Sequence, residues 1–225
     1  MNNLQRIGGI AAIAEAVIYI SAFIFFGTSW HYPSNENTVT QLAYLAEHQF
    51  SYTAITFIMY VLFGVILAVL TLALYERLKH KSPVIMQIAT IFGVIWVGLV
   101  IASGMISNVG LGIIIKLSIN EPEKAMTMWG TISAIVQGMG GGNEVVGGIW
   151  VLLLSIAALK NNEPFNKSFN ASFTLLNFFG LLVGMAGILT IYPAEVLTAI
   201  FGIGQIVWFL GLGFVMLKSA PSKHT

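Results

Sequence analysis

The sequence predicts an all-α membrane protein, a polytopic bundle of six transmembrane helices, on three observations. Of its 225 residues, 57% are hydrophobic and only 8% are charged, which lies outside the range of soluble globular domains. The apolar residues gather in six stretches of about 20, the length that a helix needs to cross ~30 Å of hydrocarbon. Eight of the ten Lys and Arg residues fall in alternate gaps between these stretches.

The six spans lie within a single domain of residues 1–225. Helices are required because lipid cannot hydrate the backbone, and the apolar runs are too long for barrel strands. The first run contains Glu15 and lacks a small-residue cleavage site, so it is interpreted as a retained span and not as a signal peptide. In the fifth, Gly180 and Gly184 form a small-xxx-small pair, which favours close helix packing. The predicted spans are residues 7–27, 53–75, 84–107, 138–159, 173–191 and 194–217.

The distribution of basic residues predicts that both termini lie in the cytoplasm. Lys and Arg concentrate in the cytoplasmic loops of membrane proteins. Here only Lys116 and Lys124 fall in the connections of the opposite side. An even number of spans agrees with this orientation, because it returns the chain to the side on which it began. The eight residues assigned to the cytoplasmic side are Arg6, Arg77, Lys79, Lys81, Lys160, Lys167, Lys218 and Lys223.

Two outer connections are expected to contain short helices at the membrane interface. In the first, Thr38 and Gln41 fit a capping box, and apolar residues recur at helical spacing as far as Phe50. In the second, a cap at Asn120 followed by Pro122 predicts a helix that runs toward a glycine cluster. Aromatic residues that favour the headgroup layer lie near the predicted outer helix ends. They are Trp30, Tyr32, Tyr52, Trp129 and Tyr192.

The most specific local feature is the glycine-rich segment around Glu144. On a continuous helix this carboxyl group shares its face with four glycines, so it stands in a trough that a neighbouring backbone can approach closely. Counted from Lys160 at 1.5 Å per residue, Glu144 lies about 24 Å up, in the outer quarter of the membrane. The four glycines are Gly140, Gly141, Gly147 and Gly148.

Three interpretations of Glu144 remain open. In the first, the glycines form a packing face, and Glu144, protonated or hydrogen-bonded, ties its helix to a neighbour. In the second, the glycines break the helix and Asn143 caps its lower part, so that a helix N-terminus faces a polar recess. That recess suits an anion or another small polar ligand, although Glu144 itself opposes an anion. In the third, Glu144 binds a proton or a cation that reaches it from outside.

Other polar residues near the outer helix ends are candidates for lining an outward-facing recess with Glu144. By helical rise, Tyr60 lies about 10 Å deep in the second span. The third span ends in Ser and Asn residues, although helix ends are often polar for structural reasons alone. The complete candidate site for an ion or substrate is Glu144, Asn143, Ser103, Ser107, Asn108 and Tyr60.

A second candidate pair lies near the membrane midplane. Glu15 is about 13 Å above Arg6 by helical rise, and Gln205 in the sixth span comes out at a similar depth. A charge at this depth costs about 2.5–3.5 kcal/mol on insertion scales, which the apolar neighbours can offset. Structural pairing of Glu15 with Gln205 and a role of Glu15 in a proton relay are therefore both open.

The sequence contains no catalytic constellation, cofactor motif or metal site. Without Cys, disulfides, thiolate metal sites and iron–sulfur clusters are excluded, and without Asp, an aspartyl protease is excluded. A net charge of +1 gives no attraction to nucleic acid. The four histidines fall in predicted loops or in the tail, away from the spans, so they predict neither a haem nor a zinc site. They are His31, His48, His80 and His224.

Five segments carry a resemblance to a known family. The most specific is GGGNEVVGGIW at residues 140–150. The others are RIGGI at 6–10 with Glu15, LALYERL at 72–78, IFGVIW at 91–96 and FGIGQIVWF at 201–209. Through these segments nearly the whole chain resembles a bacterial family of six-helix integral membrane proteins, domain of unknown function 4386 and its relatives. The resemblance implies a bacterial plasma-membrane location but brings no activity and no site residues.

Three functional classes follow. The simplest is a membrane component that binds a membrane-protein partner or senses the envelope, because nothing catalytic can be assembled. The second is a small secondary transporter or proton-coupled carrier that uses Glu144. The third is a lipid-directed enzyme at the outer interface, for which no acid–base pair is evident. In every class the lipid bilayer surrounds the chain.

Overall fold

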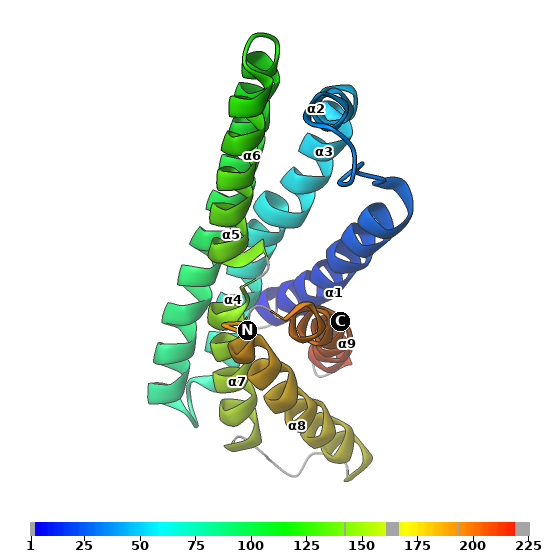
Figure 1. The fold of residues 1–225 in the computed structure, drawn as a ribbon. Coiled ribbons are helices and arrows are strands. Elements are labelled where there is room, and N and C mark those ends of the chain that lie inside the picture. The colour runs from blue at the N-terminus through cyan, green and yellow to red at the C-terminus, as the bar shows by residue number, and fades with distance from the viewer. Residues whose placement is uncertain (1–2, 142, 161–166, 193, 219–225) are drawn as a thin grey trace.

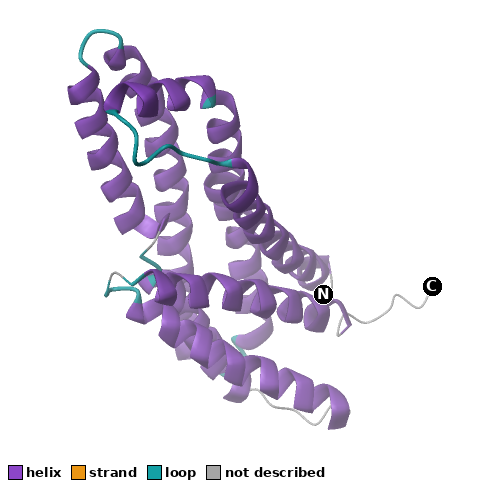
Figure 2. Ribbon diagram, turned by 45° about the vertical axis from the view of Figure 1, so that its right-hand side comes forward, coloured by secondary structure: helices purple, strands orange, loops and turns teal. Residues whose placement is uncertain are grey.

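The computed structural model describes residues 3–141, 143–160, 167–192 and 194–218, and the described chain is helical with short connections and no strand (Figures 1 and 2). The prediction of an all-helical chain is confirmed. Of the three short segments labelled η, two are single π-helical turns, and the third, η3, is kinked at the non-helical residue Gly140. The elements are α1 (Asn3–Ile24), η1 (Phe25–Ser29), α2 (Thr38–Glu47), α3 (Gln49–Thr56), η2 (Phe57–Leu62), α4 (Phe63–Leu78), α5 (Pro83–Ser118), α6 (Pro122–Val136), η3 (Gln137–Gly141), α7 (Val145–Lys160), α8 (Lys167–Leu189) and α9 (Glu195–Lys218).

By length and composition, five helical segments in the described chain are able to cross a membrane. A sixth apolar helix, Phe173–Leu189, is shorter and corresponds to the predicted fifth span. The third predicted span lies within α5, and this helix does not end at residue 107 but continues to Ser118. Its 36 residues make it about 54 Å long, well beyond the ~30 Å of a hydrocarbon core. The five segments are Asn3–Ser29, Gln49–Leu78, Pro83–Ser118, Pro122–Lys160 and Glu195–Lys218.

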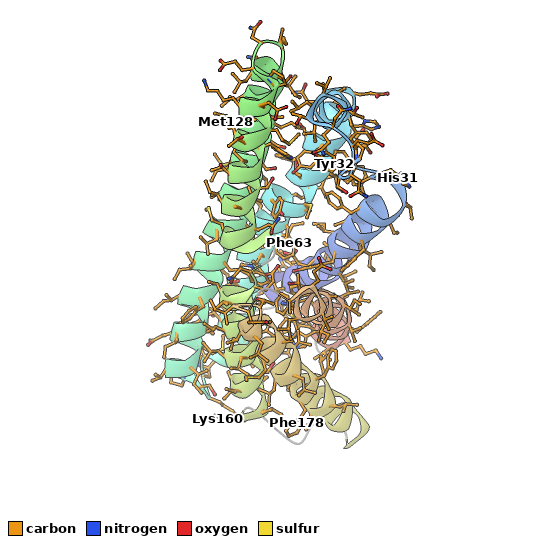
Figure 3. The ribbon with its side chains drawn as sticks, viewed as in Figure 1. His31, Tyr32, Phe63, Met128, Lys160 and Phe178 are labelled. Atoms are coloured by element: carbon orange, nitrogen blue, oxygen red, sulfur yellow. The ribbon has the colours of Figure 1, made fainter. Side chains whose placement is uncertain are left out.

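The connections before and after α5 lie at opposite ends of the molecule. The α4–α5 connection and the end of α7, marked by Lys160, lie at one end, and the α5–α6 connection lies at the other (Figures 1 and 3). Tyr32 and Met128 lie on the far side of Phe63 from Lys160 (Figure 3). The connection after α4 and the end of α7 are therefore at the same end of the molecule.

A closed circuit of aromatic rings forms the centre of the core. Phe63 of α4 contacts Trp96 of α5, Trp96 contacts Trp150 of α7, and Trp150 contacts Trp208 of α9, with ring centroids 5.6–5.9 Å apart. Phe209 closes the circuit, with its centroid 5.5 Å from Trp208 and 6.4 Å from Phe63. All five side chains are at most 3% exposed. Large rings at such separations bury much apolar surface, so this circuit joins four spans into one core.

The outer end has a separate small core between the first outer connection and the α5–α6 pair. Leu42 and Leu45 of α2 are buried against Leu111 and Ile114 of α5 and Ala125 of α6. Four of the five predicted interface aromatics, Trp30, Tyr32, Tyr52 and Trp129, pack on this core or on each other, whereas Tyr192 is 71% exposed. The helix α5 extends past its predicted end because these residues give its last turns a buried face.

Both predicted outer helices form, but their predicted caps are wrong. The cap of α2 is Asn37, whose Oδ1 accepts a hydrogen bond from the Thr40 N–H at 3.0 Å. Thr38 lies one residue inside and donates its hydroxyl to Glu123 of α6 at 3.2 Å, which links the two outer connections. The Gln41 amide donates to carbonyl groups before the helix. In α6 the cap position is occupied by Glu121, which makes no capping side-chain bond, and not by Asn120.

Glycines allow α7 and α8 to cross with their backbones in contact. A Cβ atom added at Gly148 would lie 2.6 Å from the Ile188 nitrogen and 2.7 Å from the Gly184 oxygen. One added at Gly184 would lie 2.8 Å from the Gly148 oxygen. The small-xxx-small pair in α8 therefore serves packing within the chain, and α8 is held against the start of α7.

We predict that Gly148→Ala lowers the free energy of unfolding by about 1–3 kcal/mol, because the methyl group meets backbone atoms that cannot move aside independently. Gly98→Ala in α5 is the matched control, since nothing lies within 4 Å of its added Cβ. In that exposed position alanine should leave stability unchanged or raise it by up to about 1 kcal/mol. Thermal unfolding of both purified variants in detergent measures the difference, and equal melting temperatures would contradict the close crossing.

Candidate functional site

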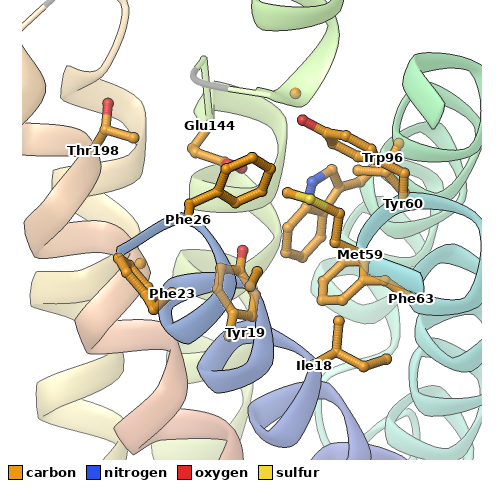
Figure 4. A pocket seen from close by; sticks show the side chains of 14 residues that line it. Ile18, Tyr19, Phe23, Phe26, Met59, Tyr60, Phe63, Trp96, Glu144 and Thr198 are labelled. Atoms are coloured by element: carbon orange, nitrogen blue, oxygen red, sulfur yellow. The ribbon is translucent and has the colours of Figure 1, made fainter. Parts of the chain in front are cut away.

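A cavity of about 250 Å³ lies beside the aromatic circuit and is walled by residues from seven elements (Figure 4). The helices α1, α4, α5 and α9 contribute to it. Two π-helical turns also contribute, with Phe26 from η1 and Met59 and Tyr60 from η2, and Gly140 comes from the kinked segment η3. Single π-helical turns are rare and often mark functional sites, because the extra residue redirects nearby side chains. Their convergence on one space singles out this cavity.

The helix that carries Glu144 is broken directly before it. The segment η3 follows α6, Gly140 within it has a φ of 129°, and α7 begins only at Val145. Such a φ is readily adopted by glycine alone. The glycines before and after the break do not share one face, so the continuous helix of the first interpretation is wrong. The break expected in the second interpretation is present, and Glu144 occupies the position before the first turn of α7.

Three hydrogen bonds satisfy the backbone N–H groups at the break. The Asn143 N–H donates to the Gln137 oxygen at 3.0 Å, and the Val145 N–H donates to the Asn143 side-chain oxygen at 3.3 Å. The Glu144 N–H donates to the Thr190 hydroxyl at 2.7 Å, and that hydroxyl in turn donates to the Gly187 oxygen at 2.6 Å. Thr190, just beyond α8, thus fixes the backbone of Glu144. This contact of Thr190 was not predicted from the sequence.

The carboxyl group of Glu144 points into the cavity and is only 8% exposed (Figure 4). Its Oε2 atom is buried and has no hydrogen-bond partner among the described residues. None of the described side chains lining the cavity is basic. An ionised carboxylate buried without a partner is costly, so charge on Glu144 has to be balanced by a bound proton or by a cation from outside the chain. The positive end of α7 adds a weaker stabilisation of negative charge at this position.

Two tyrosines are the other titratable groups in the cavity wall. Tyr19 of α1 lies within electrostatic reach of both Glu144 and Glu15, and its hydroxyl is directed toward the side on which Glu144 lies (Figure 4). Tyr60 of η2 also interacts electrostatically with Glu144. Both are hydrogen-bond donors that can face a ligand bound at the carboxyl group. Neither forms a hydrogen bond to Glu144 in this conformation, within the part of the chain that the structure describes.

Of the six predicted site residues, the structure brings only Glu144 and Tyr60 to the cavity. Ser107 is hydrogen-bonded to the Tyr52 hydroxyl at 3.0 Å, and Asn108 accepts from Thr56 at 2.6 Å, so both tie α5 to α3. Ser103 is fully buried in α5 and does not line the cavity. Asn143 stabilises the helix break. The polar end of the third predicted span is thus a helix contact and not a recess.

Glu15 and Gln205 are both 0% exposed, but no hydrogen bond joins them. Both carboxylate oxygens of Glu15 and both amide heteroatoms of Gln205 lack a partner among the described residues. Neither residue lines the cavity. The indole nitrogens of Trp96, Trp150 and Trp208 are also buried without an acceptor among the described residues. The described core therefore contains several buried polar groups with unused hydrogen-bonding capacity.

Most of the cavity wall was not predicted from the sequence. Phe23, Phe26, Met59, Phe63 and Trp96 are apolar residues in apolar helices, and nothing in their spacing separates a ligand-facing side chain from a lipid-facing one. The described residues contain no group of three or more His, Asp or Glu side chains able to hold a metal ion. The cavity wall thus combines one carboxyl group with two phenols, one threonine and a large aromatic surface.

Comparison with known proteins assigns neither a family nor a function. No protein-family model matches the chain, and no curated protein or solved structure matches it.

We predict that Thr190→Val lowers the free energy of unfolding by about 1–3 kcal/mol, because it leaves the buried Glu144 N–H without an acceptor. Valine has nearly the size of threonine, so the effect isolates the hydroxyl. Thr190→Ser keeps the acceptor and should retain most of the stability. Thermal unfolding of the two variants in the same detergent tests this. A serine variant as unstable as the valine variant would show that the methyl group, and not the hydrogen bond, fixes the break.

Proposed function

We propose that this protein is a small plasma-membrane carrier with six spans and both termini in the cytoplasm, and that Glu144 binds a proton or a cation during transport. The proposal rests on one observation. The carboxyl group of Glu144 is buried, has no basic partner among the described residues and faces a cavity of about 250 Å³. Of the three functional classes open to the sequence, only the carrier makes use of this arrangement.

The six-span arrangement is supported by length and by charge. Beyond the five long apolar segments, α8 has 23 residues and is about 35 Å long, enough to cross a hydrocarbon core. The α4–α5 connection contains Lys79 and Lys81 and lies at the same end as Lys160, whereas Lys116 and Lys124 belong to the opposite end (Figure 1). The excess of positive charge favours the first of these ends as cytoplasmic. Membership of the six-helix family resembled by the sequence would agree with this arrangement.

The helix break supports a carrier over a purely structural subunit. Transporters commonly build their sites near interrupted helices, where irregular backbone lines a cavity and is shielded from lipid. Here the interruption at Gly140 and the carboxyl group of Glu144 adjoin the same cavity. A subunit that acts through its outer surface has no need of a buried internal carboxyl group without a basic partner among the described residues. A lipid-directed enzyme would need an acid and a base near its substrate, and the described residues of the cavity wall include one carboxyl group and no histidine.

We expect single cysteines to report the proposed topology, because the natural chain has none. Asn35→Cys and Tyr192→Cys should react with a membrane-impermeant maleimide in intact cells. His80→Cys should react only after the membrane is permeabilised. All three positions are exposed, so accessibility depends on the side of the membrane. Labelling of His80→Cys in intact cells would contradict the proposed orientation. Protection of Tyr192→Cys in intact cells would contradict the proposal that α8 crosses the membrane.

We predict that Glu144→Gln abolishes cation-dependent proton movement in proteoliposomes, because the amide neither binds a proton nor balances a cation. Glu47→Gln, an exposed acid at the end of α2, is the matched control and should transport like the natural protein. Fluorescence of an internal pH indicator after addition of a cation gradient measures the exchange. Equal proton movement by the Glu144→Gln and natural proteins would overturn the proposed role of the carboxyl group, provided that both proteins elute as the same single species.

A further inference from the structure

The cavity wall is mainly aromatic. Six of its 14 described lining residues carry rings, and they come from α1, η1, η2, α4 and α5. Figure 4 shows these rings on several sides of the space into which Glu144 points. The six are Tyr19, Phe23, Phe26, Tyr60, Phe63 and Trp96. The faces of aromatic rings carry negative electrostatic potential, and this potential attracts cations most strongly where water is excluded.

Inorganic cations are poorly matched to this wall. Hard metal ions prefer shells of about six to eight oxygen ligands. The described lining offers one carboxyl group, two phenolic hydroxyls and the Thr198 hydroxyl, spread over different helices. No cluster of acidic or histidine side chains is available in the described chain to complete a shell. A cation that does not require oxygen ligands fits the wall better.

The charge and the size of the cavity further restrict the class of ligand that it can bind. The single carboxyl group balances one positive charge, and no second acid lines the cavity among the described residues. The volume of about 250 Å³ falls just below the ~300–1,000 Å³ typical of sites for drug-sized ligands. The ligand is therefore a small monocation, and the apolar rings require that its uncharged part be hydrophobic.

We propose that the cavity binds small organic monocations, namely substituted ammonium ions that carry an aromatic or alkyl group. The ammonium group lies beside the Glu144 carboxylate, within reach of the faces of Tyr19 and Tyr60, and the apolar substituent packs among the phenylalanine rings. This assignment rests on the proposed function and names the substrate class for its ion site. A proton and such a cation compete for the same carboxyl group, so loading one releases the other.

The test compares three probes that separate charge from hydrophobic contact. Benzyltrimethylammonium has both the charge and the ring, and neopentylbenzene is its neutral carbon isostere. Tetramethylammonium has the charge alone. Binding to the purified full-length protein is measured by titration calorimetry at one fixed pH, with partitioning into protein-free micelles subtracted. We expect benzyltrimethylammonium to bind about tenfold or more tightly than either of the other two probes.

Two pairs of variants locate the binding. Glu144→Gln should weaken binding of benzyltrimethylammonium by about tenfold or more, whereas Glu47→Gln should leave it unchanged. Phe26→Leu should weaken it severalfold, whereas Phe50→Leu, at a position 86% exposed and outside the cavity, should not. Each variant is first required to match the natural protein in its elution profile, so a loss of binding is not a loss of folding.

The outcomes separate this inference from the proposed function. If Glu144→Gln stops proton movement but benzyltrimethylammonium binds no better than tetramethylammonium, the ion site stands and the substrate class is wrong. If benzyltrimethylammonium and its neutral isostere bind equally, the cavity is only a hydrophobic site and the inference is overturned. If the cation binds the natural protein and Glu144→Gln alike, both the inference and the proposed role of Glu144 fail.

Discussion

The structure around the cavity depends on one constraint, which is that a buried backbone break needs internal partners for its polar groups. Each buried N–H left without an acceptor would cost several kcal/mol. The chain between α6 and α7 meets this requirement with a carbonyl of η3, the amide oxygen of Asn143 and the hydroxyl of Thr190. Thr190 can reach the break only because the glycines let α7 and α8 approach so closely. The position of Glu144 therefore follows from contacts made by two other segments.

The cavity and the aromatic circuit beneath it have different physical characters. The circuit is closed, almost fully buried and formed by rings on four helices, so its packing holds those helices together. Two π-helical turns interrupt regular α-helical bonding in the first and second long apolar segments, and the kink at Gly140 interrupts the fourth. Trp96 and Phe63 belong to both regions, since they are part of the circuit and also line the cavity. A rigid core thus supports a site whose walls lie at irregular points of the chain.

The order of helices along the chain was predictable, because a long apolar segment has few stable structures available to it in lipid. The two short outer helices and the apolar segments follow from such patterns. The cap of α2 was misplaced by one residue because Asn37 and Thr38 are both good capping residues, and only the contact of Thr38 with Glu123 separates them. The polar group of Ser107 and Asn108 was assigned to a recess because a sequence does not show that Tyr52 and Thr56 stand opposite them. Glu144 was singled out from the sequence because a carboxyl group among glycines is costly in an apolar segment, and the structure places it in the cavity wall. The aromatic wall was not predictable, because a phenylalanine that faces a cavity and one that faces lipid look identical in sequence.

The presence of one carboxyl group in the cavity has a consequence for energetics. If a single site holds either one proton or one monovalent cation, each complete cycle moves equal charge in both directions. No net current then crosses the bilayer, so the electrical part of the proton-motive force does no work on the exchange. The accumulation ratio of the cation is limited by the difference in acidity between the two compartments alone, at about tenfold for each pH unit.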